Sequence, residues 1–574
     1  MKKLYTTLLL LLTASTISSS QVPTLQWVRQ IGSVGYDYAT SMAVDPAGNV
    51  YTTGYFNGTV DFDPGNGVHN LTETGNNICF LSKTDALGNF VWAKTVTNVL
   101  VSAPPALTID KAGTIYVTGA FLGKTDFDSG PDSTILTTNG MTDIFVAKYT
   151  NDGELIWARN MGGLSDDYAT GIAVDDAGNV VITGKFWGTA DFDPGNGEYK
   201  LTTKTTDLFI AKLDAAGTFV WAKQLMVYTH SNDSESAAIT VDAAGNVYTT
   251  GNFAYEADFD PGPGEHIEKA SNQGNDIFIS KLDAAGNFRW AKKIGGAMLD
   301  AGTDIKVDAA GYVYVTGLFR YESDFDPDST EQILVSSGNE DICVLKLDSN
   351  GKLQWAKKMG GAQSDAGYSL TLDSKGNVYT AGFFNGIADF DPGQEIQTMT
   401  ASGSSVYISK ASPSDIFISK LDPNGNYLWS RQLGGSFAVS IGIDATDAIY
   451  VAGTLSGIGD FDPGAGQRLL SSVGVTDIFI LKLPEVPVSV DEESIAPRLT
   501  LYPSPINGVA TVQFGKTIST GTLRVLNILG QTIIERTELS GESCTIDLYN
   551  QASGMYMVEL TSGGEVRRRN LVKE

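Results

Sequence analysis

The sequence has few of the residues on which common active sites depend. It contains only three cysteines and three histidines among 574 residues. The cysteines, Cys79, Cys343 and Cys544, are widely spaced, odd in number and match no metal-binding spacing. The histidines fall in no metal or catalytic-triad motif, and no Gly-rich phosphate loop follows a strand and opens a helix. Nothing in the sequence therefore establishes an enzyme, and no cofactor is firmly indicated.

Long apolar runs and positive charge are also scarce. No segment beyond the N-terminal leader reaches 18 apolar residues, so we expect no membrane-spanning helix and no integral membrane protein. Lys and Arg number 39 against 66 Asp and Glu, giving a net charge of −27. Such a chain repels phosphate, so we expect no nucleic-acid partner. The charge fits the solubility of a secreted surface, cation binding or attraction to a basic partner. We expect a monomer.

The first 20 residues are typical of a secretory signal peptide. Lys2 and Lys3 precede the apolar run 8–12, and mostly small residues follow before Gln21. We therefore expect residues 1–20 to be removed on export.

The tripeptide Asp-Phe-Asp recurs along most of the chain and reveals a repeat architecture. Successive copies are 65 to 71 residues apart, and seven copies at a nearly fixed period mean repeated structural units. The first aspartates of these copies are Asp61, Asp126, Asp191, Asp258, Asp324, Asp389 and Asp460.

Each repeat holds the signals of four strands. A strand bearing Trp precedes an irregular stretch, and the next two hairpins close with turns such as 45–49 and 283–287, in which Asp caps the backbone and Gly takes the left-handed position. Four-stranded units repeated radially make a β-propeller, so we predict an all-β fold with seven blades over residues 21–483. The surplus length lies around Asp-Phe-Asp, where residues 190–193 and 199–202 predict an additional small hairpin.

The two ends of the repeat region predict how the ring closes. The last repeat finishes at residues 478–483 without a following Trp strand, whereas the first begins with an unpartnered one at 25–29. We expect this N-terminal strand to be the outermost strand of the final blade, leaving no open edge. A Pro- and acid-rich linker at 484–497 follows, and residues 498–574 predict a small, separate, sandwich-like β domain.

Two resemblances extend this interpretation. Trp-Ala-Lys-x-x-Gly-Gly, Asp-x-x-Gly-Asn-Val-Tyr-x-Thr-Gly and Asp-Ile-Phe-Ile-x-Lys-Leu-Asp resemble the SBBP β-propeller repeats of secreted bacterial proteins, a family with no single defined activity. Residues 501–505, 525–531 and 554–558, with the basic end 567–573, resemble a type IX secretion sorting domain; Ser504 stands where Asn is usual. This second resemblance implies a Bacteroidota-type bacterium and recognition of residues 498–574 by the secretion machinery. It also implies outer-membrane crossing, removal of the domain, and release or attachment to the cell surface.

The Asp-Phe-Asp segments allow two interpretations. In an extended segment both aspartates point to one side and Phe to the other. Phe then fills the blade core while Asp caps the following Pro-Gly turn. Alternatively the carboxylates bind Ca²⁺, which prefers six to eight oxygens, although the spacing does not match an EF-hand loop. The candidate metal ligands are Asp61, Asp63, Asp191, Asp193, Asp258, Asp260, Asp389 and Asp391.

A second set of positions, in the long connections, varies from repeat to repeat, as expected of an asymmetric binding face. Eight residues before the first turn Asp, four repeats carry Asp and three carry Ser102, Ser234 or Ser436. The alternative is that these long connections simply drift. Aromatic residues near this face could stack on a sugar ring or shield the blade ends. The candidate ligand-binding residues are Asp37, Tyr38, Asp167, Tyr168, Trp187, Asp300 and Asp365.

Three functions remain open from the sequence. The first is a non-enzymatic secreted or cell-surface propeller that binds glycan or protein through its long-loop face. The second is a polysaccharide hydrolase or lyase, which would need a carboxylate pair in a deep pocket. The third is a purely structural coat or adhesion component.

Overall fold

The computed structural model divides the chain into two compact units, Met1–Val486 and Pro487–Glu574. The predicted signal peptide and residues 485–497 of the predicted linker lie outside the described residues. The structure describes residues 23–484 except 73–76, 99–103, 129, 131, 228–234, 329, 403–413, 436 and 465, and residues 500–573 except 503–507, 519, 528–530 and 563–564.

The described residues form strands and one three-residue 3-10 turn, η1 (Ser271–Gln273), which confirms the all-β prediction. Four kinds of strand recur in the first unit, here named inner, second, third and outer. The inner strands are β2 (Tyr38–Val44), β8 (Ala106–Ile109), β12 (Tyr168–Val174), β16 (Glu235–Val241), β22 (Ala301–Val307), β26 (Ala366–Leu372) and β32 (Phe437–Ile443). The second strands are β3 (Val50–Phe56), β9 (Ile115–Asp126), β13 (Val180–Asp191), β17 (Val247–Ala254), β23 (Val313–Asp324), β27 (Val378–Asn385) and β33 (Ile449–Leu455).

The remaining positions complete each unit. The third strands are β6 (Ile78–Thr84), β10 (Ile135–Tyr149), β14 (Lys200–Leu213), β20 (Asn275–Leu282), β24 (Ile333–Leu347), β30 (Ser414–Leu421) and β36 (Asp477–Leu483). The outer strands are β7 (Phe90–Asn98), β11 (Leu155–Gly163), β15 (Phe219–Val227), β21 (Phe288–Gly296), β25 (Leu353–Gly361), β31 (Tyr427–Leu433) and β1 (Trp27–Ile31).

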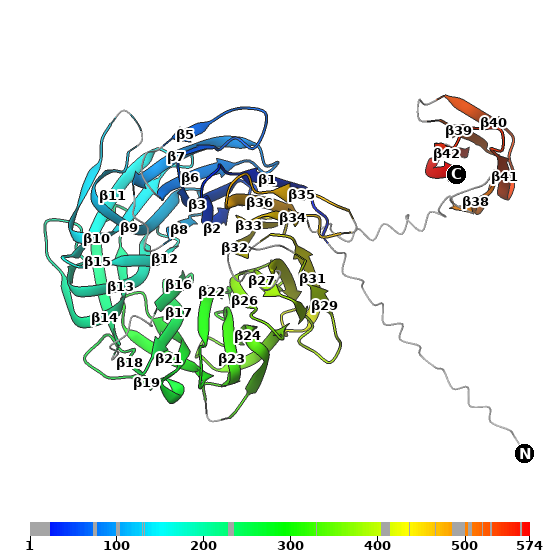
Figure 1. Cartoon of the computed structure of the whole chain (residues 1–574). Coiled ribbons are helices and arrows are strands. Elements are labelled where there is room, and N and C mark those ends of the chain that lie inside the picture. The colour runs from blue at the N-terminus through cyan, green and yellow to red at the C-terminus, as the bar shows by residue number, and fades with distance from the viewer. Residues whose placement is uncertain are drawn as a thin grey trace, which may run out of the picture. The chain divides into compact units, whose positions relative to one another are not determined.

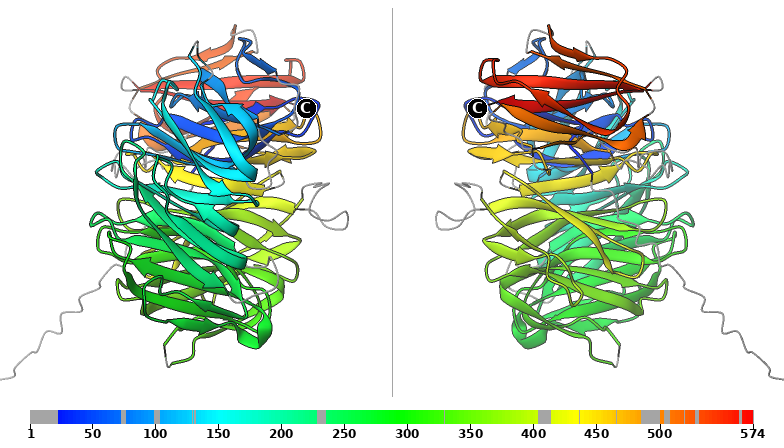
Figure 2. Two further views of the ribbon diagram at one scale, coloured as in Figure 1. Left: turned by 90° about the vertical axis from the view of Figure 1, so that its left-hand side faces the viewer. Right: turned by 90° about the vertical axis from the view of Figure 1, so that its right-hand side faces the viewer.

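Antiparallel pairing joins these strands, in the order inner, second, third and outer, into seven four-stranded blades within residues 27–483 of the described chain. The blades follow one another around a central opening, with the inner strands nearest to it (Figure 1). Seen from the side, the strands of neighbouring blades stack face to face (Figure 2). This is the propeller architecture that the repeats predicted.

The N-terminal strand closes this ring as the terminal repeats predicted. β1 pairs antiparallel with β36, from Trp27↔Lys482 to Ile31↔Ile478, and so becomes the outer strand of the blade that also holds β32 and β33. The last and first blades share one apolar core, in which Tyr450 and Ile480 pack with Val50 and Phe56. The first and last segments of the repeat region are therefore bound within one sheet.

An extra hairpin extends each blade from its Asp-Phe-Asp segment toward the preceding blade. At β13, Ala190 pairs with Leu201, as the sequence predicted, and also with Gly163 of β11 in the preceding blade. The same cross-blade pairing joins β15 to β18, β21 to β23 and β25 to β28. Where they are separate strands, the hairpins consist of β4 (Thr59–Asp61), β5 (Asn70–Thr72), β18 (Glu256–Asp258), β19 (Ile267–Lys269), β28 (Ile387–Asp389), β29 (Thr398–Thr400), β34 (Ile458–Asp460) and β35 (Leu469–Ser471).

The repeating Trp and Lys residues hold neighbouring blades together at the tight-turn face. The Trp92 indole N–H donates to the carbonyl of Asn151 in the next blade at 3.3 Å, and the Lys83 ammonium donates to the same carbonyl at 3.0 Å. Lys83 also lies 5.1 Å from the ring centroid of Tyr51, whose hydroxyl donates to the turn residue Asp45. These residues recur at the same spacing in the repeats, and in most blades the Trp indole N–H binds the turn of the next blade.

The second unit contains two small sheets around one core. One sheet has the order β37-β38-β41 and the other β40-β39-β42-β43. Val512 and Phe514 from the first sheet pack with Val525 and Val558 from the second, which is a sandwich-like arrangement. The strands are β37 (Thr500–Tyr502), β38 (Val509–Ile518), β39 (Thr522–Leu526), β40 (Thr532–Arg536), β41 (Gly541–Asp547), β42 (Gly554–Ser562) and β43 (Glu565–Lys573).

Candidate ligand-binding face and central channel

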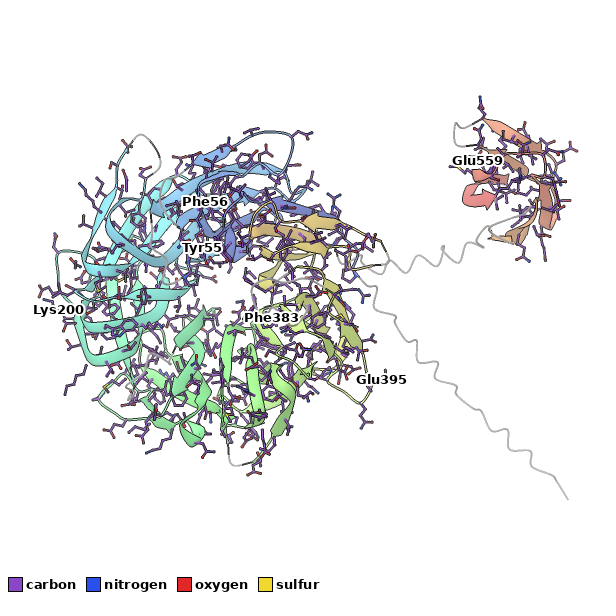
Figure 3. The ribbon with its side chains drawn as sticks, viewed as in Figure 1. Tyr55, Phe56, Lys200, Phe383, Glu395 and Glu559 are labelled. Atoms are coloured by element: carbon purple, nitrogen blue, oxygen red, sulfur yellow. The ribbon has the colours of Figure 1, made fainter. Side chains whose placement is uncertain are left out.

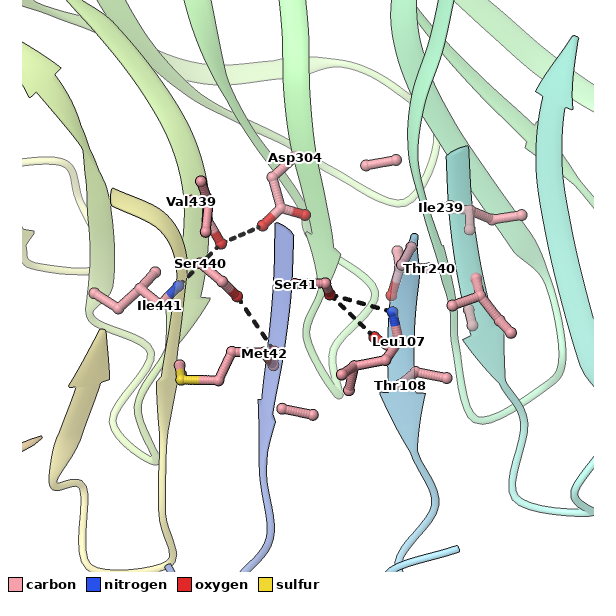
Figure 4. Close-up of a pocket in the computed structure, with 18 of the residues that line it drawn as sticks. Ser41, Met42, Leu107, Thr108, Ile239, Thr240, Asp304, Val439, Ser440 and Ile441 are labelled. Carbon is pink, nitrogen blue, oxygen red and sulfur yellow. Dashed lines mark hydrogen bonds between the residues drawn. The ribbon is translucent and has the colours of Figure 1, made fainter. Parts of the chain in front are cut away.

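The inner strands enclose a central cavity of about 470 Å³. Its lining is made of hydroxyl, small and apolar side chains from all seven inner strands, and Asp304 and Lys306 of β22 are its charged lining residues. The two charges lie 2.8 Å apart. The other oxygen of Asp304, which is labelled in Figure 4, accepts the Ser369 hydroxyl of the neighbouring blade at 3.0 Å. A ligand in the channel would therefore meet a largely uncharged wall with one ion pair.

Hydroxyl groups tie the inner strands to one another around the channel. The Ser41 side chain accepts the backbone N–H of Leu107 at 3.2 Å, and the Ser440 hydroxyl donates to the carbonyl of Met42 at 3.2 Å (Figure 4). These bonds cross from one blade to the next because inner strands expose one unpaired backbone edge. Hydrogen bonds between blades thus stabilise the channel wall, and the residues at its surface can differ from blade to blade.

The residues that differ most between blades lie where the inner strands begin, on the long-loop face. In six blades the first residue of the inner strand pairs with the sixth residue of the second strand: Tyr38 with Tyr55, and Tyr168 with Lys185. Elsewhere the pairs are Glu235 with Asn252, Ala301 with Leu318, Ala366 with Phe383, and Phe437 with Thr454. Figure 3 shows Tyr55 and Phe383 beside the central opening. We call these residues the channel mouth.

Aromatic side chains gather at three places on this face. Tyr36 stacks on Tyr38 with ring centroids 6.4 Å apart, and Tyr38 in turn lies 5.0 Å from Tyr55. Tyr368 of β26 lies 5.5 Å from Phe383. The structure also brings together two residues selected from the sequence, Tyr168 and Trp187, at 5.6 Å; their clustering leaves ligand contact a prediction.

The four aspartates selected from the sequence are all fully buried. Asp167 accepts the backbone N–H of Gly163 at 2.7 Å and that of Trp187 at 3.1 Å. These carboxylates therefore join the end of the preceding outer strand, or the segment after it, to the second strand, and ligand contact by them stays a prediction. The same pattern, with both oxygens accepting backbone N–H groups, holds for Asp37, Asp300 and Asp365. The serines at this position in the other repeats lie outside the described residues.

Each of these aspartates lies near a second buried carboxylate that sequence reasoning missed. A Cβ added to Gly162 would lie 2.7 Å from Asp143 Oδ1 and 3.0 Å from Asp167 Oδ2, so the glycine hydrogen separates the two groups. Burial raises the pKa of Asp143 to about 6 and that of Asp167 to about 7. This second carboxylate is the first residue of each Asp-Ile-Phe-Ile segment, and its repetition in the sequence could have identified it. Equivalent pairs are Asp276 with Asp300, Asp341 with Asp365 and Asp477 with Asp37.

The Asp-Phe-Asp segments serve turn formation and packing. Asp61 accepts the backbone N–H groups of Asp63 and His69, Asp63 accepts that of Gly65, and Phe62 is fully buried against Phe56. The same bonds recur for Asp191, Asp193, Asp258, Asp260, Asp389 and Asp391.

Calcium binding by these residues stays a prediction. Within the described residues, no group of three or more His, Cys, Asp or Glu side chains is placed to hold a metal ion. Oδ1 of each aspartate accepts backbone N–H groups of its own hairpin. Ca²⁺ prefers six to eight oxygens, more than the two carboxylates of one segment supply.

Comparisons with known proteins agree with both parts of the chain. A family model described as a secretion system C-terminal sorting domain matches residues 500–574, and a beta-propeller repeat model, SBBP, matches residues 26–60. The chain is 22% identical over 516 residues to an uncharacterized WD repeat-containing protein of Acanthamoeba polyphaga mimivirus, covering 75% of this chain and 36% of that protein. It is 24% identical over 234 residues to the regulatory protein FlaEY of Caulobacter vibrioides, covering 39% and 23%.

The chain thus spans about a third or less of the length of these two relatives. A solved structure of a protein of unknown function from Bacteroides caccae aligns with a TM-score of 0.27 and 10% identity, over 57% of this chain and 87% of that chain. In the described part of the chain, no helix is both long enough and apolar enough to cross a bilayer. The chain is therefore a β-propeller protein with SBBP repeats and a C-terminal sorting domain, exported by type IX secretion to the cell surface or the medium.

Proposed function

We propose that the propeller is a non-enzymatic binding or adhesion module that takes a glycan or protein ligand at the channel mouth. The observation that carries this proposal is the difference between blades at that position. Residues that pack the blades repeat almost unchanged, whereas the strand-starting pairs at the mouth are aromatic in some blades, charged or small in others. A position needed only for folding would be expected to repeat with the rest.

The shape of the site also favours binding. An open cavity lined by hydroxyl and apolar groups, with aromatic clusters at its mouth, matches the general composition of ligand sites in proteins. Partly exposed aromatic rings supply a large contact area for sugar or protein.

A hydrolase or lyase receives less support. The close carboxylate pairs with raised pKa, such as Asp143 with Asp167, are fully buried and held by backbone N–H groups. A catalytic carboxylate must touch its substrate, so these pairs do not supply the acid and base that glycoside hydrolysis requires.

The test is binding by residues 21–483 to a glycan array and to surface proteins of neighbouring cells. We expect micromolar or tighter binding to one ligand class, reduced at least about tenfold by Tyr38→Ala or Tyr168→Ala. Leu87→Ala, at an exposed tight turn that belongs to the opposite face, is the matched control and should leave affinity unchanged. Absence of any ligand, or equal loss in the control, would contradict the proposal.

A further inference from the structure

Two exposed tyrosines occupy a backbone position that favours glycine. Three residues before each Asp-Phe-Asp segment, the chain turns with a positive φ. Two neighbouring blades place Tyr255 and Tyr321 there, both with φ of 61°. The other five blades place Gly58, Gly123, Gly188, Gly386 and Gly457 there, with φ between 62° and 77°.

This conformation costs a tyrosine free energy that glycine does not lose, because Cβ crowds the backbone in the left-handed region. The turn itself does not need tyrosine. The carbonyl of Tyr255 accepts the N–H of Ala270 at 2.7 Å, and the carbonyl of Gly386 accepts that of Ala401 at the same distance. Strain that folding does not require is a mark of a functional position.

The two side chains point toward solvent. Tyr255 is 43% exposed and Tyr321 is 47% exposed. At the equivalent Gly58 and Gly123, an added Cβ would meet no atom within 4 Å, so a side chain at this position leaves the blade surface. The Arg320 guanidinium lies over the Tyr321 ring, 5.4 Å from its centroid.

A carboxylate follows each ring. Glu256 and Glu322 come directly after the tyrosines, where the other blades carry Thr, Lys or Ile. The Glu256 carboxylate accepts the Lys269 ammonium through Oε1 at 2.5 Å. An aromatic ring followed along the chain by a carboxylate acceptor matches a pyranose, which offers C–H groups on one face and hydroxyl donors at its edge. The carboxylates and the net charge of −27 disfavour a polyanionic sugar.

We propose that Tyr255 and Tyr321, with Glu256 and Glu322, form a platform for a neutral, hydroxyl-rich glycan on two neighbouring blades. This inference rests on the proposed binding function and names its ligand class and contact residues. Tyr255 directly follows β17, and Tyr321 lies within β23. Both strands are in the green sector of the ring (Figure 1). It is separate from the channel-mouth residues Tyr38 and Tyr168.

The test combines stability with binding in Tyr255→Gly and Tyr321→Gly. Because glycine relieves the strain, each variant should melt about 1–2 °C higher than the parent. Each should bind neutral oligosaccharides (glucan, xylan, mannan and galactan oligomers on an array) at least about tenfold more weakly. Gly58→Tyr is the matched control, which introduces the same strain in another blade and should lower the melting temperature without changing affinity.

The outcomes separate this inference from the proposed function. Lower melting temperatures in both glycine variants would show that the tyrosines serve folding, and the platform would be refuted. Unchanged affinity in these variants, with loss in Tyr38→Ala, would refute the platform while the channel mouth stands. Binding of a protein or an acidic glycan alone would refute the neutral-glycan assignment, and binding of nothing would refute both proposals.

Discussion

Buried carboxylates dominate the chemistry of this protein at the scale of single residues. Asp143 and Asp167 are both fully buried, and Asp143 Oδ1 has no hydrogen-bond partner. Burial raises the pKa of both groups, to about 6 and about 7. The folded chain therefore holds protons that the unfolded chain releases above about pH 4. The stability that this pair contributes is fully present below about pH 4 and is lost as the pH rises to about 7.

Asp143→Asn is expected to stabilise the propeller at pH 8, on the order of 2 kcal/mol, because it removes one of two close negative charges. The gain should shrink at pH 5, where the parent pair is largely protonated. Thermal unfolding at several pH values measures both effects.

Asp175→Asn is the contrasting control. Burial alone would raise the pKa of Asp175, but hydrogen bonds from Asn179 and Lys212 lower it below its usual value. This variant should therefore be less stable than the parent at pH 8. A destabilised Asp143→Asn protein at pH 8 would show that the pair does not repel.

At the scale of elements, β1 joins the last blade to the first. It supplies an outer strand, and the Trp27 indole N–H donates to the carbonyl of Ala86 in the first blade at 3.1 Å. Deleting residues 23–31 would leave β36 with an unpaired edge and remove buried apolar side chains from two cores.

This deletion is expected to lower the melting temperature by more than 10 °C and to promote association through the open edge. Calorimetry and size-exclusion chromatography measure the two effects. Trp27→Phe isolates the single hydrogen bond and should cost only about 1 kcal/mol. A deletion variant that melts like the parent and stays monomeric would contradict the role of β1 in closure.

Periodic elements could be predicted from the sequence, whereas contacts between distant segments could not. The Trp strands, the Asp-x-x-Gly turns and the Asp-Phe-Asp hairpins repeat, so each copy supports the interpretation of the others. The inward orientation of Asp167 depends on Gly163 and on Trp187, which lies twenty positions further along the chain. No local pattern in the sequence indicates that approach, so the burial of this aspartate could not be predicted from its place on a long connection.

At the scale of the whole molecule, the two compact units have separate cores. Truncation after residue 486 should leave the unfolding transition of the propeller within about 2 °C of its value in the longer chain. Differential scanning calorimetry of both proteins measures this. A shift of many degrees would show that the units stabilise one another.

Export of the propeller should depend on the sorting domain. Deleting residues 500–574 should stop the propeller from reaching the cell surface or medium of a bacterium with type IX secretion. Cell fractionation with antibody detection should then find the propeller in the periplasm, on the inner side of the outer membrane. An alteration confined to the binding face, such as Tyr255→Gly, should leave export intact.

Pairing between β1 and β36 makes the two ends of the repeat region depend on each other. Within the repeat region, Trp27 is synthesised near the start and its partner Lys482 near the end. β1 therefore cannot pair until the intervening blades have been synthesised. A prematurely terminated chain keeps that strand without a partner. Ring closure therefore distinguishes a chain that extends to β36 from one that stops earlier, because only the longer chain offers β1 its partner.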